Sequence, residues 1–215
     1  FVPTQTVKIE KNKTAEVKFN NILKKGSLQV YKIDSEYPDN KLSGAVFEVY
    51  DSNKNAVGTL TEIEKGLYRL DNIPYGDYTL KEITSPTGFL PDTNEYEFKI
   101  RTNGEVVTVE TMPRVGFANT PIKGSFSLYK LDGNTQKPLQ GAEFTLYDMN
   151  NTALKTAVTD ENGYLEFTDI RYGSYYVKET KAPENYELDD NVYGFMILEH
   201  GKTVEYKKTN DSEKG

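Results

Sequence analysis

An internal repeat restricts the fold of this chain more than any other feature of the sequence. Three stretches of the first half recur in the second half in the same order, displaced by 97 or 98 residues. The matched pairs are KGSLQVYKID (25–34) with KGSFSLYKLD (123–132), LSGAVFEVYD (42–51) with LQGAEFTLYD (139–148), and PYGDYTLKE (74–82) with RYGSYYVKE (171–179). Such self-similarity indicates one structural unit, of about 95 residues, that is used twice.

The first residues indicate part of a third copy. VKIEKNKTAEVKFNN (7–21) aligns without a gap on MILEHGKTVEYKKTN (196–210), which ends the second full unit. We therefore expect residues 1–25 to be the C-terminal strands of a truncated upstream domain, followed by full domains at 26–123 and 124–215. The sequence has no initiator Met and no visible signal peptide, which favours a fragment cut from a longer chain.

Each unit contains about seven short runs that are rich in Val, Ile, Thr, Tyr and Phe and are separated by turn signals. No segment sustains a helical periodicity over ten or more residues. The pattern predicts an all-β fold of tandem immunoglobulin-like β-sandwiches with seven short strands each. The expected strands lie near 26–33, 44–50, 56–62, 66–71, 76–84, 94–101 and 105–119, and near 124–131, 141–147, 154–160, 163–168, 173–180, 192–199 and 203–210.

The final run of the first unit is longer than its counterpart. Fifteen residues separate Gly104 from Asn119, whereas nine separate Gly201 from Asn210. We expect the extra residues to form a bulge or loop around TMPRVG (111–116).

The composition excludes several classes of function. A net charge of −7 argues against nucleic acid and anionic membranes as partners, and no apolar stretch approaches the roughly 20 residues of a membrane helix. The absence of cysteine excludes disulfides, thiolate catalysis and Cys-ligated zinc. The only histidine, His200, falls in a predicted turn, so ordinary hydrolase and metalloenzyme functions fit poorly. DENG (160–163) and Asp189–Asp190 lack the spacing of an EF-hand, and we expect turns there, with no metal and no cofactor.

Side chains two residues apart share one face of a strand, and in the predicted strands the apolar, core-facing set of such residues ends in a polar residue. In GDYTLKEITSP (76–86), the apolar face of the strand ends in Glu82. The corresponding row of the first strand ends in Lys32, and that of the last strand ends in Asn119. The second unit repeats all three positions. The two candidate triads are therefore Lys32, Glu82 and Asn119, and Lys130, Glu179 and Asn210.

A lysine, a glutamate and an asparagine in one apolar interior can react with each other. Burial disfavours charge, so it lowers the pKa of a lysine and raises that of a glutamate. A proton transfer then leaves a neutral amine, which is a nucleophile, and a neutral acid, which can shuttle protons. The amine can attack the Asn carbonyl and expel ammonia, and this leaves a Lys–Asn amide. The reaction occurs once per molecule, so the chain modifies itself and is not an enzyme with turnover.

Each position also has a plainer interpretation. The lysines can extend toward solvent from the strand ends, and Glu82 and Glu179 can form salt bridges at a sheet edge. The tyrosines Tyr172, Tyr175 and Tyr176 can stack on sugars, although outward tyrosines are common on strands. The matched positions in two copies favour the triads over these alternatives.

Both units resemble the B-type (CnaB, SpaA-like) domains of Gram-positive surface adhesins and pilins. The resemblance rests on VYKID and LYKLD, LSGAVFEVYD and LQGAEFTLYD, YTLKEITSPTGF and YYVKETKAPENY, and the terminal FANTP and KKTN. It implies intramolecular isopeptide bonds from Lys32 to Asn119 and from Lys130 to Asn210, assisted by Glu82 and Glu179. Two departures are Ser85-Pro86 in place of Ala-Pro and the absence of Phe before Asn210.

The same resemblance extends to the first residues. There, Asn21 would be the unpaired acceptor of the upstream domain, with Asn20 as an adjacent competitor. Its lysine and glutamate would lie upstream.

The sequence and the resemblance together predict a structural stalk or spacer of a cell-wall-linked adhesin or pilus. We expect an extracellular, cell-surface protein that is a monomer, does not insert into a membrane in this segment, and contacts adjacent repeats of its own chain. The alternative is a ligand-binding module that recognises a host matrix protein or a glycan. The near-equal copies favour the spacer, since binding domains usually diverge from stalk repeats.

Overall fold

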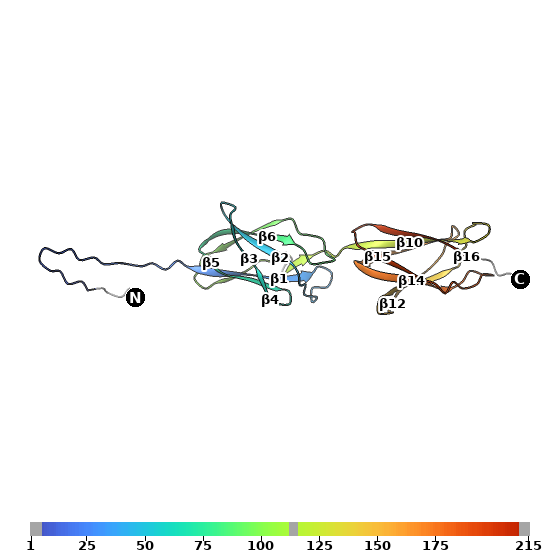
Figure 1. Ribbon diagram of the computed structural model, residues 1–215, viewed down its shortest axis with the longest axis horizontal. Coiled ribbons are helices and arrows are strands. Elements are labelled where there is room, and N and C mark those ends of the chain that lie inside the picture. The colour runs from blue at the N-terminus through green and yellow to red at the C-terminus, as the bar shows by residue number, and fades with distance from the viewer. Residues whose placement is uncertain (1–5, 112–115, 211–215) are drawn as a thin grey trace.

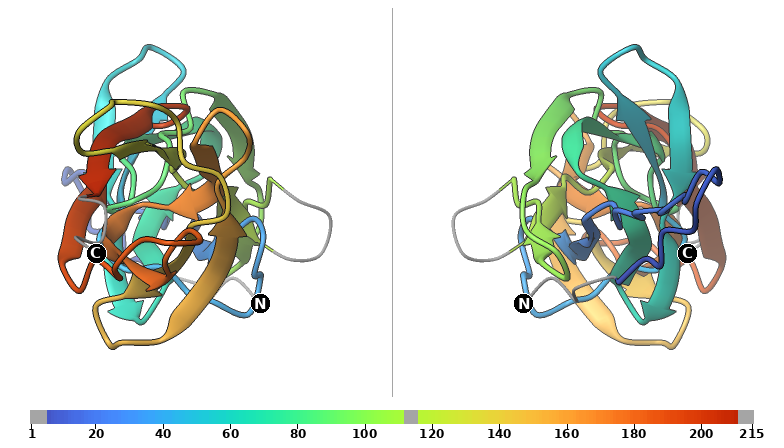
Figure 2. Two further views of the ribbon diagram at one scale, coloured as in Figure 1. Left: turned by 90° about the vertical axis from the view of Figure 1, so that its right-hand side faces the viewer. Right: turned by 90° about the vertical axis from the view of Figure 1, so that its left-hand side faces the viewer.

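Two β-sandwiches lie end to end along the long axis of the molecule, and an extended tail precedes them (Figure 1). The computed structural model describes residues 6–111 and 116–210, except for the side chains of 207–210. Every regular element in these residues is a β-strand. The predicted all-β class of two tandem sandwiches is therefore confirmed, and views along the long axis show the two units one behind the other (Figure 2).

The first unit consists of two sheets. One has the order β4-β5-β1-β8, with β9 also paired to β1, and the other has the order β3-β2-β6-β7. The strands are β1 (Lys25–Asp34), β2 (Val46–Asp51), β3 (Ala56–Thr59), β4 (Thr61–Glu64), β5 (Leu67–Pro74), β6 (Gly76–Thr84), β7 (Glu95–Ile100), β8 (Val106–Thr108) and β9 (Phe117–Asn119).

The second unit repeats this arrangement. Its sheets have the orders β13-β10-β16 and β12-β11-β14-β15. The strands are β10 (Lys123–Asp132), β11 (Glu143–Asp148), β12 (Ala153–Val158), β13 (Tyr164–Arg171), β14 (Gly173–Lys181), β15 (Val192–Ile197) and β16 (Thr203–Asn210).

The first and last strands of each unit run parallel to each other. In the second unit β10 pairs with β16 without interruption, from Ser125 opposite Thr203 to Asp132 opposite Asn210. In the first unit β1 pairs with β8 near its start and with β9 near its end. The strand by which the chain enters a unit therefore lies directly beside the strand by which it leaves.

One predicted strand of the first unit is in fact two. The expected strand at 56–62 divides into β3, which pairs with β2, and β4, which pairs with β5 in the other sheet. Leu60 lies between them and is buried, and its amide donates to the carbonyl of Phe47. The chain changes sheets at this residue because its side chain belongs to the core while the flanking residues pair with different neighbours.

The expected strand at 105–119 is also divided. β8 and β9 are separated by the extra residues of the first unit, of which 112–115 lie outside the described part. The Thr111 amide donates to the Gly116 carbonyl at 3.0 Å, and the Thr111 hydroxyl accepts from the Ala118 amide at 2.8 Å. Hydrogen bonds thus join the residues on either side of the insertion, and the bulge or loop predicted around TMPRVG falls mostly on residues outside the described part, so it stays a prediction.

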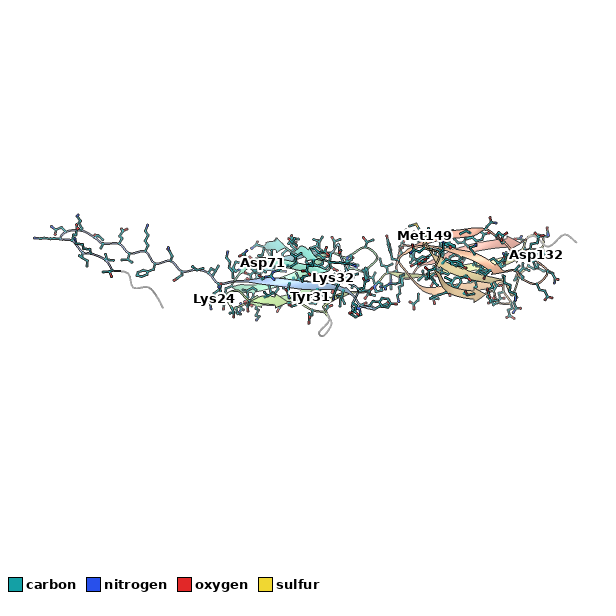
Figure 3. All side chains as sticks on the ribbon, turned by 90° about the horizontal axis from the view of Figure 1, so that it is seen from below. Lys24, Tyr31, Lys32, Asp71, Asp132 and Met149 are labelled. Atoms are coloured by element: carbon teal, nitrogen blue, oxygen red, sulfur yellow. The ribbon has the colours of Figure 1, made fainter. Side chains whose placement is uncertain are left out.

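The described part of the tail, residues 6–24, contains no strand. Ile9, Phe19 and Ile22 are exposed there, and Lys24 marks the point where the tail meets the first sandwich (Figure 3). A pair of strands is unstable in water without further strands to cover it. The origin of residues 1–25 as the end of an upstream domain therefore stays a prediction.

Each sandwich has its own apolar core. Aromatic rings occupy the centre of both, with Phe47 and Phe117 in edge-to-face contact at 5.0 Å in the first unit and Phe126 and Phe195 at 4.4 Å in the second. Buried residues from both sheets of a unit join in one cluster, which is separate from that of the other unit. Each unit therefore buries its own core, as expected for two domains.

The junction between the units is a hydrogen-bonded connection. The linker comprises residues 120–122. On the side of the first unit, the Thr120 carbonyl accepts from the Leu90 amide and the Ile122 amide donates to the Gly88 carbonyl, both at 2.8 Å. On the side of the second unit, the Ile122 carbonyl accepts from the Tyr172 amide at 2.9 Å. Two ion pairs also cross it. Arg171 Nη2 lies 2.5 Å from Asp34 Oδ2 and Lys123 Nζ lies 2.5 Å from Glu36 Oε1. The linker is thus fixed to both units along its length.

Candidate functional site

The first candidate site lies between the two sheets of the first unit. Lys32 comes from β1 and Asn119 from β9 in one sheet, whereas Glu82 comes from β6 in the other. The period-2 pattern of β1 and β6 directs these side chains inward because their neighbours on the same face are apolar. Lys32, Glu82 and Asn119 are all buried, with 0%, 9% and 2% of their surface exposed. The predicted polar residues do share one interior.

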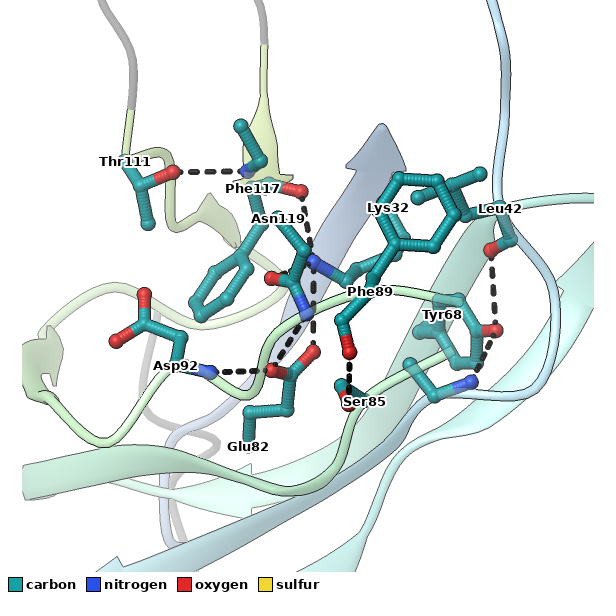
Figure 4. A network of polar contacts seen from close by, with 12 residues as sticks. Lys32, Leu42, Tyr68, Glu82, Ser85, Phe89, Asp92, Thr111, Phe117 and Asn119 are labelled. Carbon is teal, nitrogen blue, oxygen red and sulfur yellow. Dashed lines mark hydrogen bonds and ion pairs between the residues drawn. The ribbon is translucent and has the colours of Figure 1, made fainter. Parts of the chain in front are cut away.

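The three side chains contact each other directly (Figure 4). Lys32 Nζ donates to Asn119 Oδ1 and to the Phe117 carbonyl, the latter at 3.2 Å. Glu82 Oε1 lies 3.3 Å from Lys32 Nζ, and Glu82 Oε2 accepts from Asn119 Nδ2 at 2.8 Å. The carboxylate therefore bridges the amine and the carboxamide from the opposite sheet.

Burial of Lys32 disfavours the charged form of its amine. Burial lowers the pKa of Lys32 from 10.5 to about 8, against the opposing attraction of the Glu82 carboxylate. The ring of Phe117 lies with its centroid 4.7 Å from Nζ. An amine of lowered pKa in contact with a carboxamide is a nucleophile beside an electrophilic carbonyl. The arrangement is chemically suited to amide exchange with the loss of ammonia.

The second unit places its lysine and glutamate in the same way. Lys130 and Glu179 are buried, and Lys130 Nζ lies 3.0 Å from Glu179 Oε1. An aromatic ring again lies near the amine, but it is that of Phe144 on β11, with its centroid 5.3 Å from Nζ, and not one on the last strand as Phe117 is in the first unit. Asn210 pairs with Asp132 in the backbone register, as Asn119 pairs with Asp34 in the first unit. The side chain of Asn210 lies outside the described residues, so the third member of this triad stays a prediction.

The structure adds a feature that the search for polar triads missed. The backbone amide of Asp92 donates to Glu82 Oε2 at 2.9 Å, and that of Asp189 donates to Glu179 Oε2 at 2.8 Å. A backbone donor leaves no mark of its own on a sequence. The available signal was the repeated spacing of DTNEY (92–96) and DDNVY (189–193), which share Asp, Asn and Tyr.

The other predicted candidates lie away from these sites. Asn21 is exposed in the tail. His200 Nδ1 accepts from the Lys123 amide at 3.2 Å, and Asp160 accepts from the amides of Asn162 and Tyr164, as in a turn. Among the described residues, no group of three or more His, Cys, Asp or Glu side chains could hold a metal ion. The same residues include no helix with the length and apolar character of a membrane span.

The tyrosines considered for sugar stacking serve other contacts. Tyr176 donates its hydroxyl to Asn151 Oδ1 at 2.8 Å, and its ring stacks on Tyr147. Tyr172 approaches Gly88 of the first unit so closely that an added Cβ there would lie 3.1 Å from its ring. Tyr175 stacks on Phe195 at the edge of the second core.

Comparison with known proteins identifies both units. A family model described as SpaA, prealbumin-like fold domain, matches residues 26–114 and 124–212. Serine-aspartate repeat-containing protein D of Staphylococcus aureus is 30% identical over an alignment of 153 residues, which covers 64% of this chain and 12% of that protein. Colossin-A of Dictyostelium discoideum is 30% identical over an alignment of 168 residues, which covers 73% of this chain and 2% of that protein. The chain thus spans only a small part of the length of these relatives.

Solved structures give the same answer. The structure of the Bacillus anthracis TIE protein aligns with a TM-score of 0.78 and 29% identity over 88% of this chain and 35% of that chain. The pilus adhesin SpaC from Lactobacillus rhamnosus GG shares the fold, with a TM-score of 0.54 and 18% identity over 86% of this chain and 31% of its own. The resemblance inferred from the sequence is therefore confirmed.

Proposed function

We propose that this chain, which belongs to the family of SpaA prealbumin-like fold domains, is a tension-bearing spacer in a bacterial surface adhesin or pilus. Each domain forms one internal Lys–Asn cross-link by itself. Domains of this fold occur in the pilus adhesin SpaC, which supports a place on the cell surface. The partners are the adjacent repeats of the same chain, and the cross-linking needs no cofactor.

The observation that supports this proposal most is the buried contact of Lys32 Nζ with Asn119 Oδ1, bridged by Glu82. A snorkelling lysine would have its amine in water, whereas this side chain is fully buried. An unreacted ion pair in such a place is a weak contribution to stability, since its desolvation cost offsets its attraction. The presence of these three buried side chains is therefore better explained by the reaction they can undergo than by a contribution to the stability of the domain.

The reaction needs only these three side chains. Glu82 takes a proton from Lys32, and the neutral Nζ attacks Cγ of Asn119. The new Nζ–Cγ bond forms, the Cγ–Nδ2 bond breaks, and ammonia leaves. Glu82 gives this proton to the departing Nδ2 and receives another from the attacking Nζ, so the carboxylate that began ionised ends protonated when neutral ammonia has left. The fold supplies the proximity, and well-oriented groups reach effective molarities of about 10⁵–10⁸ M.

The position of the cross-link fits a protein under tension. The chain enters the first domain along β1 and leaves after β9, and Lys32 and Asn119 lie on these two parallel strands. A bond between them would pass tension from one strand to the other, so the residues between 32 and 119 would bear no load. The hydrogen-bonded junction and its ion pairs favour a spacer that transmits this tension without a slack linker.

Single-molecule stretching of the whole chain tests this function. A cross-linked first domain cannot release the 87 residues between Lys32 and Asn119, which would extend by roughly 300 Å if unfolded. We expect no such extension for the wild type and one for Glu82→Gln, which keeps the shape of the side chain but cannot relay protons. An extension of that length in every wild-type molecule would refute the proposal.

A further inference from the structure

Each glutamate is held by a loop that the cross-linking chemistry does not by itself require. The Asp92 amide donates to Glu82 Oε2 at 2.9 Å, and the Asp189 amide donates to Glu179 Oε2 at 2.8 Å. Both loops directly precede the strand that neighbours the glutamate's own strand, β7 in one unit and β15 in the other. The same contact in both units, at the same carboxylate oxygen, is a repeated feature.

The loop is fastened by the side chain of its aspartate. Asp92 Oδ1 accepts from the Asn94 amide at 2.9 Å, and Asp92 Oδ2 accepts from the Tyr96 hydroxyl at 2.6 Å. Burial, and then the hydrogen bond to the Asp92 carboxylate, raise the pKa of Tyr96 to about 12. The hydroxyl therefore stays protonated at neutral pH and remains a donor to the Asp92 carboxylate.

The second unit repeats these contacts. Asp189 Oδ1 accepts from the Asn191 amide at 3.0 Å, and Asp189 Oδ2 accepts from the Tyr193 hydroxyl. Burial and this hydrogen bond raise the pKa of Tyr193 as well. Asp, Asn and Tyr are the three residues that DTNEY and DDNVY share, so the common sequence corresponds to the common contacts.

The loop amide makes the two oxygens of the glutamate unequal. Glu82 Oε2 accepts from two N–H donors, the Asp92 amide and Asn119 Nδ2. An oxygen that accepts two hydrogen bonds is stabilised as the anionic end of the carboxyl group. Glu82 Oε1 is buried and faces Lys32 Nζ at 3.3 Å. The proton that leaves the amine therefore arrives at Oε1, on the side where the nucleophile lies.

We infer that the Asp-x-Asn-x-Tyr loop is a positioning element for the glutamate, with Asp92 and Tyr96 as positioning residues in the first domain and Asp189 and Tyr193 in the second. Before the reaction the loop directs the proton from Lys32 Nζ to Oε1 and keeps Oε2 as the acceptor for Asn119, and the carboxyl gives that proton to Nδ2 only after Nζ has attacked Cγ. This inference rests on the proposed function, because it assigns a role within the cross-linking reaction. It adds no reagent to that reaction.

The test compares the rates of cross-linking in the two domains of one chain. The full chain is made by cell-free translation, synthesis is stopped, and samples are denatured at intervals. Mass spectrometry of tryptic peptides then quantifies the branched peptide of each domain. In Tyr96→Phe, we expect the first domain to cross-link roughly tenfold more slowly, the effect of losing one hydrogen bond to a charged group, while the second domain keeps its wild-type rate.

Two further variants separate positioning from stability. Tyr78→Phe removes another buried tyrosine hydroxyl of the first domain, one that donates to the Pro74 carbonyl at 2.8 Å near the start of β6, and it should cross-link at the wild-type rate. Asp92→Asn keeps the acceptor for the Asn94 amide but loses the carboxylate that receives the Tyr96 hydroxyl. It should cross-link at a rate between those of Asp92→Ala and the wild type.

The outcomes are distinct. A wild-type rate in Tyr96→Phe, or equal slowing in Tyr78→Phe, would overturn the positioning role while the cross-linking itself stands. Should Tyr96→Phe fail to fold, the order of rates among Asp92→Ala, Asp92→Asn and the wild type decides the question. A wild-type chain without any branched peptide would instead overturn the proposed function, and the positioning role with it.

Discussion

Replacing Glu82 by Gln should abolish the cross-link of the first domain and lower the stability of that domain alone. Gln keeps the size of the side chain and an oxygen that can accept from the Asp92 amide, but it cannot take the proton of Lys32. Lys32 and Asn119 would then remain unreacted in contact with each other. The second domain keeps Glu179 and serves as the reference within the same molecule.

The magnitude follows from the length of chain that the bond encloses. The loop from Lys32 to Asn119 spans 87 residues. In the chain-entropy treatment of cross-links, closing a loop of this length stabilises the folded state by about 4.6 kcal/mol at 25 °C. For a domain of this size, each kcal/mol corresponds to about 4–8 °C in Tm. We therefore expect the unfolding transition of the first domain to fall by roughly 20–35 °C.

Differential scanning calorimetry combined with intact-mass measurement checks this prediction. Glu82→Gln should retain one of the two ammonias, so its mass should lie about 17 Da above that of the wild type after allowing for the substitution. Glu97→Gln is the matched control because Glu97 is an exposed residue of β7, and it should change neither the number of cross-links nor the transition. A Glu82→Gln chain that loses the cross-link but keeps both transitions would refute the entropic estimate, and one that still cross-links would refute the role of Glu82.

Three further results are expected. Arg171→Ala, which removes the ion pair to Asp34 across the junction, should leave both cross-links intact but broaden the distribution of interdomain angles in small-angle X-ray scattering. An unchanged scattering profile would show that the linker hydrogen bonds suffice. In Asn119→Ala, which cannot cross-link, stability should rise from about pH 8 to pH 10 in urea titrations, because Lys32 has a pKa of about 8 when folded and 10.5 when unfolded, so the unfolded chain binds more protons there; a flat profile would contradict a buried, uncharged amine. The spacer function predicts no specific retention of host matrix proteins or glycans on an array, and saturable binding to one of them would favour the alternative function of a binding module.

Much of the fold follows from the repeat together with the period of 2 along strands. The alternating apolar positions that end in Lys32 and in Glu82 recur in the second copy, where they end in Lys130 and Glu179. This agreement between the copies favoured burial of the charged residues. The structure places the lysine and the glutamate of each copy in one interior. The change of sheets at Leu60 could not be predicted from the sequence, because β3 and β4 lie in one continuous strand-like segment. They differ only in the strands with which they pair.

Two kinds of contact could not be predicted from the sequence. One kind is made by residues that differ between the two copies, and the other is made by backbone N–H groups. Arg171 joins the two units, but the corresponding residue of the first unit is Pro74, so comparison of the repeats gives no sign of the ion pair. The Asp92 amide acts on Glu82 through a backbone N–H, which any residue type except proline could supply. Its conserved spacing between the copies was visible, yet its role depends on the loop geometry that brings the amide to the carboxylate.

The intact mass of the purified wild-type chain tests the central claim most directly. If both domains have cross-linked, the measured mass should fall about 34 Da below the value translated from the sequence, since each bond releases one ammonia. Tryptic digestion should then yield one branched peptide that joins Lys32 to Asn119 and another that joins Lys130 to Asn210. A mass equal to the translated value, with every lysine peptide linear, would contradict the account.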